Sequence, residues 1–585
     1  MIAERLQPAF VTGYERLTAW AELLDAINVY PVADADTGRN LVISLAPLHR
    51  VGPDPGAVAP RLLASATGNS GNIAAAFFAG FIAGDPAADM HAAVRAGRDR
   101  AVAAVADPMP GTMLTVLDEL LRYFEHSSSP PPDGFPGLLE TLERAVRSTT
   151  ETLPVLKAAG VVDSGALGLF LFMEGFFSGF SDRPHTFRPV TDMFGAAVRL
   201  PPGFTAGGEA DGSCVDTVVR VGPNGGPPLQ GLPGLGSSLV VQQDHDRLKI
   251  HIHTRQPAAL RRALEGAGEV ERWSEGGLGP PAPRAAHSPH PVIHIVTDAA
   301  GSITREDAAG LGVTLLASYI VVGNRSLPET VLSPEELYRS MRAGVRVTTA
   351  QASVFERHQS YQSVLGQHDR ALYLCVGSVY TGNYAAVTAW KRAHDPDDHL
   401  TVVDTGLASG RLGIAVRATA RVAQAVAGAE AVIRFAREAA RASEEYIFLD
   451  RLQYLAAGGR LSKTRGFIGD LLNVKPIITP TPEGAVKAGR ARTRREQVEF
   501  ALARLEQGMG RAAGGLILLE HSDNREWVAA EVLPAICARH PAAEVIVSPL
   551  SLTSGAHMGP GTWGVAFLPA HALAAEHEAD RHAPR

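Results

Sequence analysis

Two stretches rich in glycine and proline divide this chain of 585 residues into three parts. They are LPPGFTAGGEADGS (200–213) and EGGLGPPAPRAAHSPHP (275–291), and both lack the periodic apolar residues that pack a helix or a strand into a core. A chain of this length also exceeds what one hydrophobic core usually serves. We therefore expect a multidomain protein with domains at residues 1–199, 200–280 and 291–575.

The three parts differ in the periodicity of their apolar residues. The first carries long Ala- and Leu-rich runs with apolar residues three and four apart, which predicts an all-α domain. The second alternates apolar and polar residues in SLVVQQ and LKIHIHT around one helical run, which predicts a small α+β domain. The third repeatedly alternates apolar strands such as ALYLCVGS with helical runs, the pattern of an α/β fold.

Charge and cysteine content narrow the class of protein. The chain has 54 Lys and Arg against 61 Asp and Glu, a formal net charge of -7, and no basic block, so nucleic acid is not expected as a partner. Three widely spaced cysteines argue against a disulfide framework. The most apolar runs are too short or carry Glu174, so we expect a cytoplasmic protein with peripheral or no membrane contact.

The stretch NVYPVADADTG (28–38) places Asp34 and Asp36 one residue apart in a tight turn. Two such carboxylates can point at one centre, where a Mg²⁺ ion would turn their repulsion into binding energy. Because Mg²⁺ shares its ligands with phosphates, nearby backbone should cradle an anion, and TGNSGN, PGTMLTV and GVVDSGALG each form a turn into a helix. The alternative is that each of these turns is only a helix cap.

Together these motifs resemble the ATP-binding domain of dihydroxyacetone kinases, and more closely the kinase subunit of bacterial fatty-acid kinases. The resemblance covers nearly all of residues 1–180 and implies a helical barrel in which Asp34 and Asp36 hold two Mg²⁺ ions on ATP. The residues that it places around the nucleotide, with Asn28 as a further contributor, are Thr37, Asn40, Gly68, Asn69, Ser70, Gly71, Thr112 and Asp163. The chain departs from the family pattern at Ala35, where the family has glycine, and at Arg39 and Thr67.

The third part carries hydroxyl, guanidinium and imidazole groups near strand ends, in TTAQAS, GSVYTGNY, GGRLSK and HMGPGTWG. Such groups converging on one point would clamp a carboxylate, and apolar strands beside them could house a tail, although each group could also be an ordinary turn residue. Over residues 291–570 the pattern resembles the DegV family of fatty-acid-binding proteins. The resemblance implies that Thr349, Ser378, Arg460 and His557 lie near a fatty-acid head group.

In the middle part, His251 and His253 of IHIHT share one face of a strand because side chains alternate, and Cys214 lies on an earlier strand. A thiolate and two imidazoles suit tetrahedral zinc, although a fourth ligand is missing. The alternative is a pair of exposed strand histidines and a buried thiol. The stretch resembles the linker domain of the fatty-acid kinase, which implies a structural Zn²⁺ site.

The sequence therefore predicts a fusion that acts as an ATP-dependent fatty-acid kinase. A fatty-acid carboxylate would attack the γ-phosphate of ATP, giving an acyl phosphate for phospholipid synthesis, while Arg460 and His557 orient that carboxylate. A downstream acyltransferase would use the product, and transfer within one chain or between the chains of a homodimer stays open. Two alternatives remain: a non-enzymatic fatty-acid carrier with a decayed nucleotide site, and a dihydroxyacetone-type kinase.

Overall fold

The structure of the protein is a computed structural model, and its backbone forms two compact units. The first comprises residues 1–283 with 359–366, and the second comprises residues 284–358 with 367–585. Within these ranges the structure describes residues 2–52, 55–126, 135, 137–180, 185–201, 204, 212–221, 229–278, 291–426, 428–457, 474–510 and 514–573. By contacts the first two predicted domains therefore share one compact unit, and the division into three domains stays a prediction.

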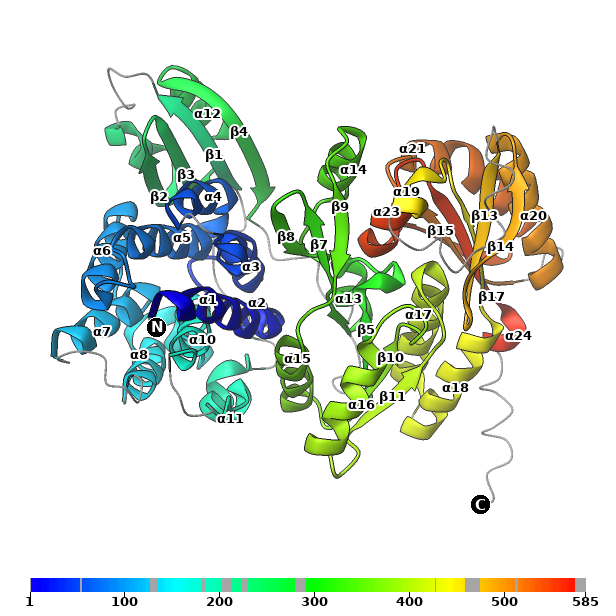
Figure 1. Ribbon diagram of the computed structural model, residues 1–585, viewed down its shortest axis with the longest axis horizontal. Helices are drawn as coiled ribbons and strands as arrows, with labels where there is room; N and C mark the ends of the chain where they lie inside the picture. Colours follow the sequence, from blue (N-terminus) through cyan, green and yellow to red (C-terminus); the bar gives the residue numbers. More distant parts are fainter. Residues whose placement is uncertain are drawn as a thin grey trace. The chain divides into compact units, whose positions relative to one another are not determined.

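The N-terminal region is helical, which confirms that part of the predicted fold class (Figure 1). Its helices are α1 (Ile2–Ala19), α2 (Ala21–Ala26), α3 (Thr37–Leu45), α4 (Val58–Ser65), α5 (Gly68–Ala83), α6 (Met90–Ala104), α7 (Met113–His126), α8 (Leu138–Thr152), α9 (Pro154–Ala159), α10 (Ser164–Ser178) and α11 (Val190–Phe194). Helices α5 and α10 are buried on almost every side. The ring centroids of Phe78, on α5, and Phe172, on α10, lie 4.5 Å apart. These two helices are the centre of the region because they are apolar all round.

These apolar helices raise the question of a membrane span. None of the helices in the ranges that the structure describes is long and apolar enough to cross a membrane. Both α5 and α10 bury their apolar faces against other helices of the same unit, α5 against α6 and α10 against α1.

The middle residues form a four-stranded antiparallel sheet with one helix. The elements are β1 (Ser213–Val221), β2 (Ser237–Asp244), β3 (Arg247–Thr254), α12 (Pro257–Glu265) and β4 (Gly268–Gly277), and the strand order is β2-β3-β1-β4. One face packs Val215 and Ile250 against Leu260 of α12 in an apolar core. Strands β2 and β3 also contact α5, so the sheet is covered on its second face as well.

The C-terminal part is an α/β fold, as predicted, with strands in three sheets (Figure 1). The sheet β11-β10-β5-β6 is parallel, β14-β13-β12-β17-β15-β16 is mixed, and β8-β7-β9 is antiparallel. The strands are β5 (His294–Asp298), β6 (Val313–Leu316), β7 (Tyr319–Val322), β8 (Arg325–Pro328), β9 (Val347–Ala350), β10 (Ala371–Cys375), β11 (Leu400–Asp404), β12 (Glu444–Phe448), β13 (Lys475–Thr481), β14 (Gly484–Ala491), β15 (Gly515–His521), β16 (Ala543–Pro549) and β17 (Trp563–Pro569).

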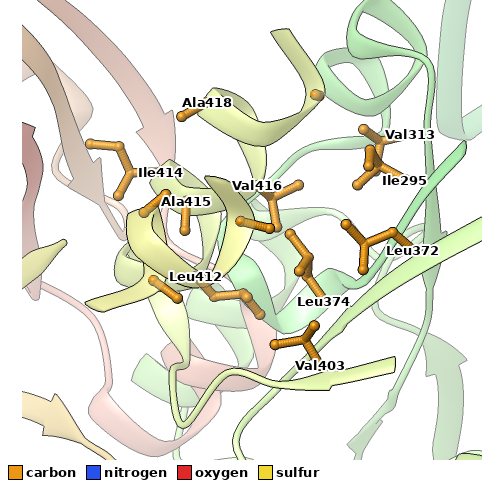
Figure 2. Close-up of a cluster of buried hydrophobic side chains, with 14 of the residues drawn as sticks. Ile295, Val313, Leu372, Leu374, Val403, Leu412, Ile414, Ala415, Val416 and Ala418 are labelled. Carbon is orange, nitrogen blue, oxygen red and sulfur yellow. The ribbon is translucent and has the colours of Figure 1, made fainter. Parts of the chain in front are cut away.

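Helices link and cover these sheets. They are α13 (Arg305–Leu311), α14 (Pro334–Arg342), α15 (Val354–Gln367), α16 (Asn383–His394), α17 (Ser409–Ala425), α18 (Ala429–Ala442), α19 (Gln453–Ala457), α20 (Arg494–Met509), α21 (Arg525–Trp527), α22 (Leu533–Arg539), α23 (Leu552–Met558) and α24 (Ala570–Leu573). Figure 2 shows Leu412 and Val416 of α17 lying against Leu374 of β10 and Val403 of β11. Helix α17 also contacts β15 and β17, so its apolar side chains join two sheets into one core.

Candidate functional site

One pocket in the first unit gathers residues from three separate sequence motifs. It encloses about 320 Å³, part of it open to solvent. Asp34 and Asp36 come from the acidic turn at residues 34–36, and Gly68 to Ser70 come from the start of α5. Strands β1 and β3 contribute Cys214, His251 and His253, which we call the thiol–imidazole cluster. The lining residues are Asn28, Tyr30, Pro31, Val32, Asp34, Asp36, Thr37, Asn40, Gly68, Asn69, Ser70, Cys214, His251 and His253. The predicted zinc residues therefore share one pocket with the two aspartates and with five of the predicted nucleotide residues.

The acidic turn holds its two carboxylates beside each other. Asp36 is the residue before α3, and its carbonyl accepts the N–H of Asn40 at 2.8 Å. Asn28 Nδ2 donates to Asp34 Oδ1 at 2.7 Å, which fixes the first carboxylate. Burial, together with the neighbouring carboxylate of Asp36, raises the pKa of Asp34 to about 7. Two adjacent acids, one of which resists ionisation, make a donor set that suits a hard divalent cation such as Mg²⁺.

The backbone between the two aspartates is in the left-handed region, with φ of +54° at Ala35. A side chain with a Cβ is strained there, whereas glycine is not. The glycine that the family pattern has at this position therefore has a conformational reason. In this chain Ala35 adopts the same kind of turn at a cost of about 1–2 kcal/mol.

The sequence did not single out Asp25, which holds the start of α3 in place. This buried carboxylate, at the end of α2, accepts the backbone N–H groups of Gly38 at 2.6 Å and Arg39 at 3.1 Å. It thereby satisfies two of the N–H groups that the first turn of a helix leaves unpaired. An isolated acid in an amphipathic helix carries no signal in the sequence for this role.

The turn at the start of α5 depends on glycine. Gly68 has φ of +66°, and a Cβ built on it would lie 2.1 Å from Asn40 Nδ2. Asn69 and Ser70 are the next residues of this first turn, so their backbone N–H groups have no acceptor within the helix. Free N–H groups and the helix dipole at this position are the features that suit a helix start to an anion, here beside Asp34 and Asp36.

The remaining predicted nucleotide residues lie outside the lining of this pocket. Asp163 is the residue before α10, where its carboxylate accepts the N–H of Ala166 at 2.7 Å, and burial raises its pKa to about 7. A Cβ on Gly165 would lie 3.3 Å from Asp163 Oδ1 and 2.8 Å from Ser70 Oγ, so Asp163 is close behind the α5 turn. Thr112 donates to the carbonyl of Met109 at 2.8 Å, and Gly71 packs against Ser44.

The thiol–imidazole cluster lies on the face of the sheet that is turned toward α5. Antiparallel pairing places Cys214 opposite His253, and a ligand atom from each of Cys214, His251 and His253 lies within 4.8 Å of the others. Both histidines are buried, so the alternative of exposed strand histidines is wrong. His251 Nε2 and His253 Nδ1 have no hydrogen-bond partner in the part of the chain that the structure describes.

The unpartnered ring nitrogens test whether zinc fits. A buried polar atom without a partner is costly, and a metal ion would satisfy both nitrogens together with the Cys214 thiolate. Burial, reinforced by His251, lowers the pKa of His253 to about 3, so this ring is neutral and able to bind a metal. Among the described residues the cluster could supply three protein ligands, the number found where zinc keeps an open position.

Two of the predicted head-group residues meet in the second unit. The Oγ1 atom of Thr349, on β9, lies 3.1 Å from Nε2 of His557, on α23. Ser378 is exposed, and its N–H donates to Asp404 Oδ1 at 3.0 Å. The fourth predicted residue, Arg460, lies outside the described residues.

Comparison with family models assigns each part of the chain. Residues 31–178 match the DAK2 domain, residues 229–274 match the middle domain of FakA-like fatty acid kinase proteins, and residues 292–570 match "Uncharacterised protein, DegV family". The chain therefore joins regions similar to these three domains in one polypeptide.

Individual proteins match in the same way. Protein YloV of Bacillus subtilis is 30% identical over 289 residues, which are 44% of this chain and 52% of YloV, so the chain spans about half the length of that relative. A DegV domain-containing protein of Clostridium perfringens is 25% identical over 281 residues, 47% of this chain and 96% of that protein. A solved structure described as fatty-acid binding of a DegV family protein from Thermus thermophilus is 26% identical, covers 47% of this chain and 99% of its own, and has a TM-score of 0.44.

The left-handed turn at residue 35 predicts that two substitutions there differ in their effect on the free energy of unfolding. Ala35→Gly should change the free energy of unfolding by less than about 1 kcal/mol, because the relief of strain is offset by the extra entropy of glycine in the unfolded chain. Ala35→Val should lower it by more than about 1 kcal/mol, because a β-branched residue is strongly disfavoured at positive φ. Urea unfolding of both variants measures this, and equal stabilities would show that the turn is not left-handed.

The raised pKa of Asp34 predicts how pH acts on the metal-free protein. The folded chain keeps the Asp34 proton up to about pH 7, whereas the unfolded chain releases it near its ordinary pKa. Stability should therefore fall as pH rises through this window, by up to about 1.4 kcal/mol per pH unit from this group. Asp34→Asn should remove that part of the slope in urea unfolding of chelator-treated protein. The exposed variant Asp99→Asn is the control, and a slope unchanged in Asp34→Asn would contradict the prediction.

The cluster at Cys214 predicts a metal stoichiometry. The purified chain should bind about one Zn²⁺ with three protein ligands, and Cys214→Ser should lose this stoichiometric binding because the thiolate is removed. Elemental analysis and competition with a chelating dye measure both. Cys537→Ser, which changes an exposed cysteine, is the matched control. Equal zinc content in the two variants would remove Cys214 from the ligand set.

Proposed function

We propose that this chain is an ATP-dependent fatty-acid kinase, which transfers the γ-phosphate of ATP to the carboxylate of a fatty acid carried by its DegV part. The observation that carries the proposal is the pocket in which Asp34 and Asp36 face the anion-binding turn at the start of α5. The family assignments support it, because the DAK2 domain is followed by a middle domain of the fatty-acid kinase type.

In this proposal the chain binds the nucleotide through fixed groups. Asp34 and Asp36 would hold Mg²⁺, which supplies positive charge to the phosphates when it is bound. Asn28 orients the Asp34 carboxylate, and Asp25 holds the helix start that carries Asp36. The backbone N–H groups of Asn69 and Ser70 would bind phosphate oxygens.

The acceptor needs little acid–base help. A fatty-acid carboxylate is already ionised at neutral pH, so its oxygen can form the new bond to the γ-phosphorus while the bond from that phosphorus to the β–γ bridging oxygen breaks and ADP leaves. Catalysis is then positioning and charge neutralisation. Thr349 and His557 would orient the carboxylate, since a hydroxyl and an imidazole can both donate to it.

The acyl phosphate formed would be a substrate for an acyltransferase, and a cytoplasmic location and a homodimer are parts of the same proposal.

The thiol–imidazole cluster would hold Zn²⁺ at the edge of the pocket, where its charge would add to that of Mg²⁺. A carrier without catalysis is the competing function, and strain at Ala35 between the two carboxylates is the observation that favours it.

The proposal predicts that ATP consumption depends on fatty acid and on the carboxylate pair. With Mg²⁺, added fatty acid should stimulate ADP release by the purified chain, and acyl phosphate should be trapped as a hydroxamate. Asp36→Asn should lower the rate at least about a hundredfold, because a metal ligand is lost at a site of charge neutralisation. Asp99→Asn, on the exposed face of α6, should leave it unchanged.

The two competing functions predict different results in the same assay. Tight binding of fatty acid without any stimulation of ADP release would establish the carrier instead of the kinase. Stimulation by dihydroxyacetone rather than fatty acid would establish a dihydroxyacetone-type kinase.

A further inference from the structure

Asp216, a residue that no motif singled out, makes an unusual number of contacts. It lies on β1 and is 6% exposed, and it contacts donors from both the sheet and α5. Its Oδ2 atom accepts from Thr67 Oγ1 at 3.2 Å and from the N–H of Gly68 at 2.9 Å, and lies 3.3 Å from His251 Nδ1. Its Oδ1 atom accepts from Asn72 Nδ2 at 3.0 Å and from Lys249 Nζ at 2.9 Å.

Three of these contacts, to Thr67, Gly68 and Asn72, are at the start of α5. Gly68 N–H is the first donor of the helix, and Thr67 is the residue before it. The carboxylate therefore takes the place of an N-cap side chain, which Thr67 itself does not provide because it makes no capping hydrogen bond. Asn72 lies one turn further along α5, and its Nδ2 atom donates to Asp216 Oδ1. The same atom also donates to the carbonyl of Gly68 at 2.8 Å.

The placement of Asp216 leaves the next N–H groups for another anion. With the Gly68 N–H occupied, the next first-turn N–H groups are those of Asn69 and Ser70, two residues that line the pocket. A carboxylate so close to a phosphate site would repel the nucleotide unless its charge were balanced. Lys249 provides this balance, because its Nζ atom lies 2.9 Å from Asp216 Oδ1.

Lys249 supports the same role. It is 2% exposed, and Asp216 is the acid with which it forms an ion pair in the described part of the sheet. Antiparallel pairing sets Asp216 opposite His251 and Lys249 opposite Val218, so the side chains of Asp216, His251 and Lys249 share the face that is turned toward α5.

We infer that Asp216 is a positioning residue of the nucleotide site: it holds the Thr67–Asn72 turn in the conformation that binds the phosphates. The middle domain then completes the site from 144 to 149 residues further along the chain. This inference rests on the proposed function in one respect, that the anion at the turn is a nucleotide phosphate.

The decisive variants are Asp216→Ala and the double variant Asp216→Ala with Lys249→Met. The single change removes the acceptor of Gly68 and Thr67, but it also leaves a buried lysine without its acid, which could unfold the sheet. The double change removes that unpaired charge while the turn still lacks its acceptor. Asp244→Ala is the matched control, because Asp244 is an aspartate of the same sheet that pairs with the exposed His245.

Two measurements on the full chain, after a chelator has removed transition metals from every variant, decide the inference. The first is the dissociation constant of Mg²⁺–ADP by calorimetry, and the second is amide hydrogen exchange of residues 66–72 without nucleotide. The double variant should melt within a few degrees of the control, bind Mg²⁺–ADP at least about tenfold more weakly, and exchange these amides at least about tenfold faster.

Each other outcome has a defined meaning. Nucleotide affinity and exchange within twofold of the control, or a change in only one of them, would overturn the positioning role of Asp216 and leave its contacts purely structural. If the parent chain binds no Mg²⁺–ADP, the proposed kinase function fails, and the exchange rates alone decide whether Asp216 orders the turn.

Discussion

The close approach of helices α3 and α5 is the constraint on which the candidate site depends. Their first turns lie side by side only because Gly68 and Gly71 have no side chains, since a Cβ at either would lie 2.1–2.2 Å from Asn40 or Ser44. This contact brings the acidic turn before α3 next to the first turn of α5. The backbone geometry thereby places two carboxylates beside the free N–H groups of a helix start, the groups that our proposal assigns to a cation and a phosphate.

Three carboxylates near this contact, Asp34, Asp163 and Asp216, have different electrostatic surroundings. Burial and the neighbouring Asp36 raise the pKa of Asp34 to about 7, so a bound cation would favour its ionised form. Burial raises the pKa of Asp163 to about 7, although the N–H of Ala166 opposes the shift. Asp216 forms an ion pair with the buried Lys249, at 2.9 Å. The site therefore has one place prepared for a cation and one acid that is already paired.

Much of this arrangement follows from local sequence. The helical periodicity of the first part and the strand–helix alternation of the third predict their fold classes, because periodicity reports directly which faces are buried. Asp34, Asp36 and the GNSG turn were recognisable because turn chemistry needs particular residues at short spacing. Asp25, Asp216 and Lys249 were not, because each is a single charged residue whose partners are distant in the chain.

The histidines of IHIHT show most clearly what local sequence does not predict. Alternation along the strand determined that His251 and His253 share a face, but whether that face was exposed depended on α5 covering it. The amino-acid sequence by itself determined the helical first part, the α/β third part, the acidic turn and the imidazole groups on one strand face. Only the tertiary structure placed the thiol–imidazole cluster and the acidic turn in one pocket and buried Asp216 against α5, because packing between distant segments is decided by the whole core and not by local pattern.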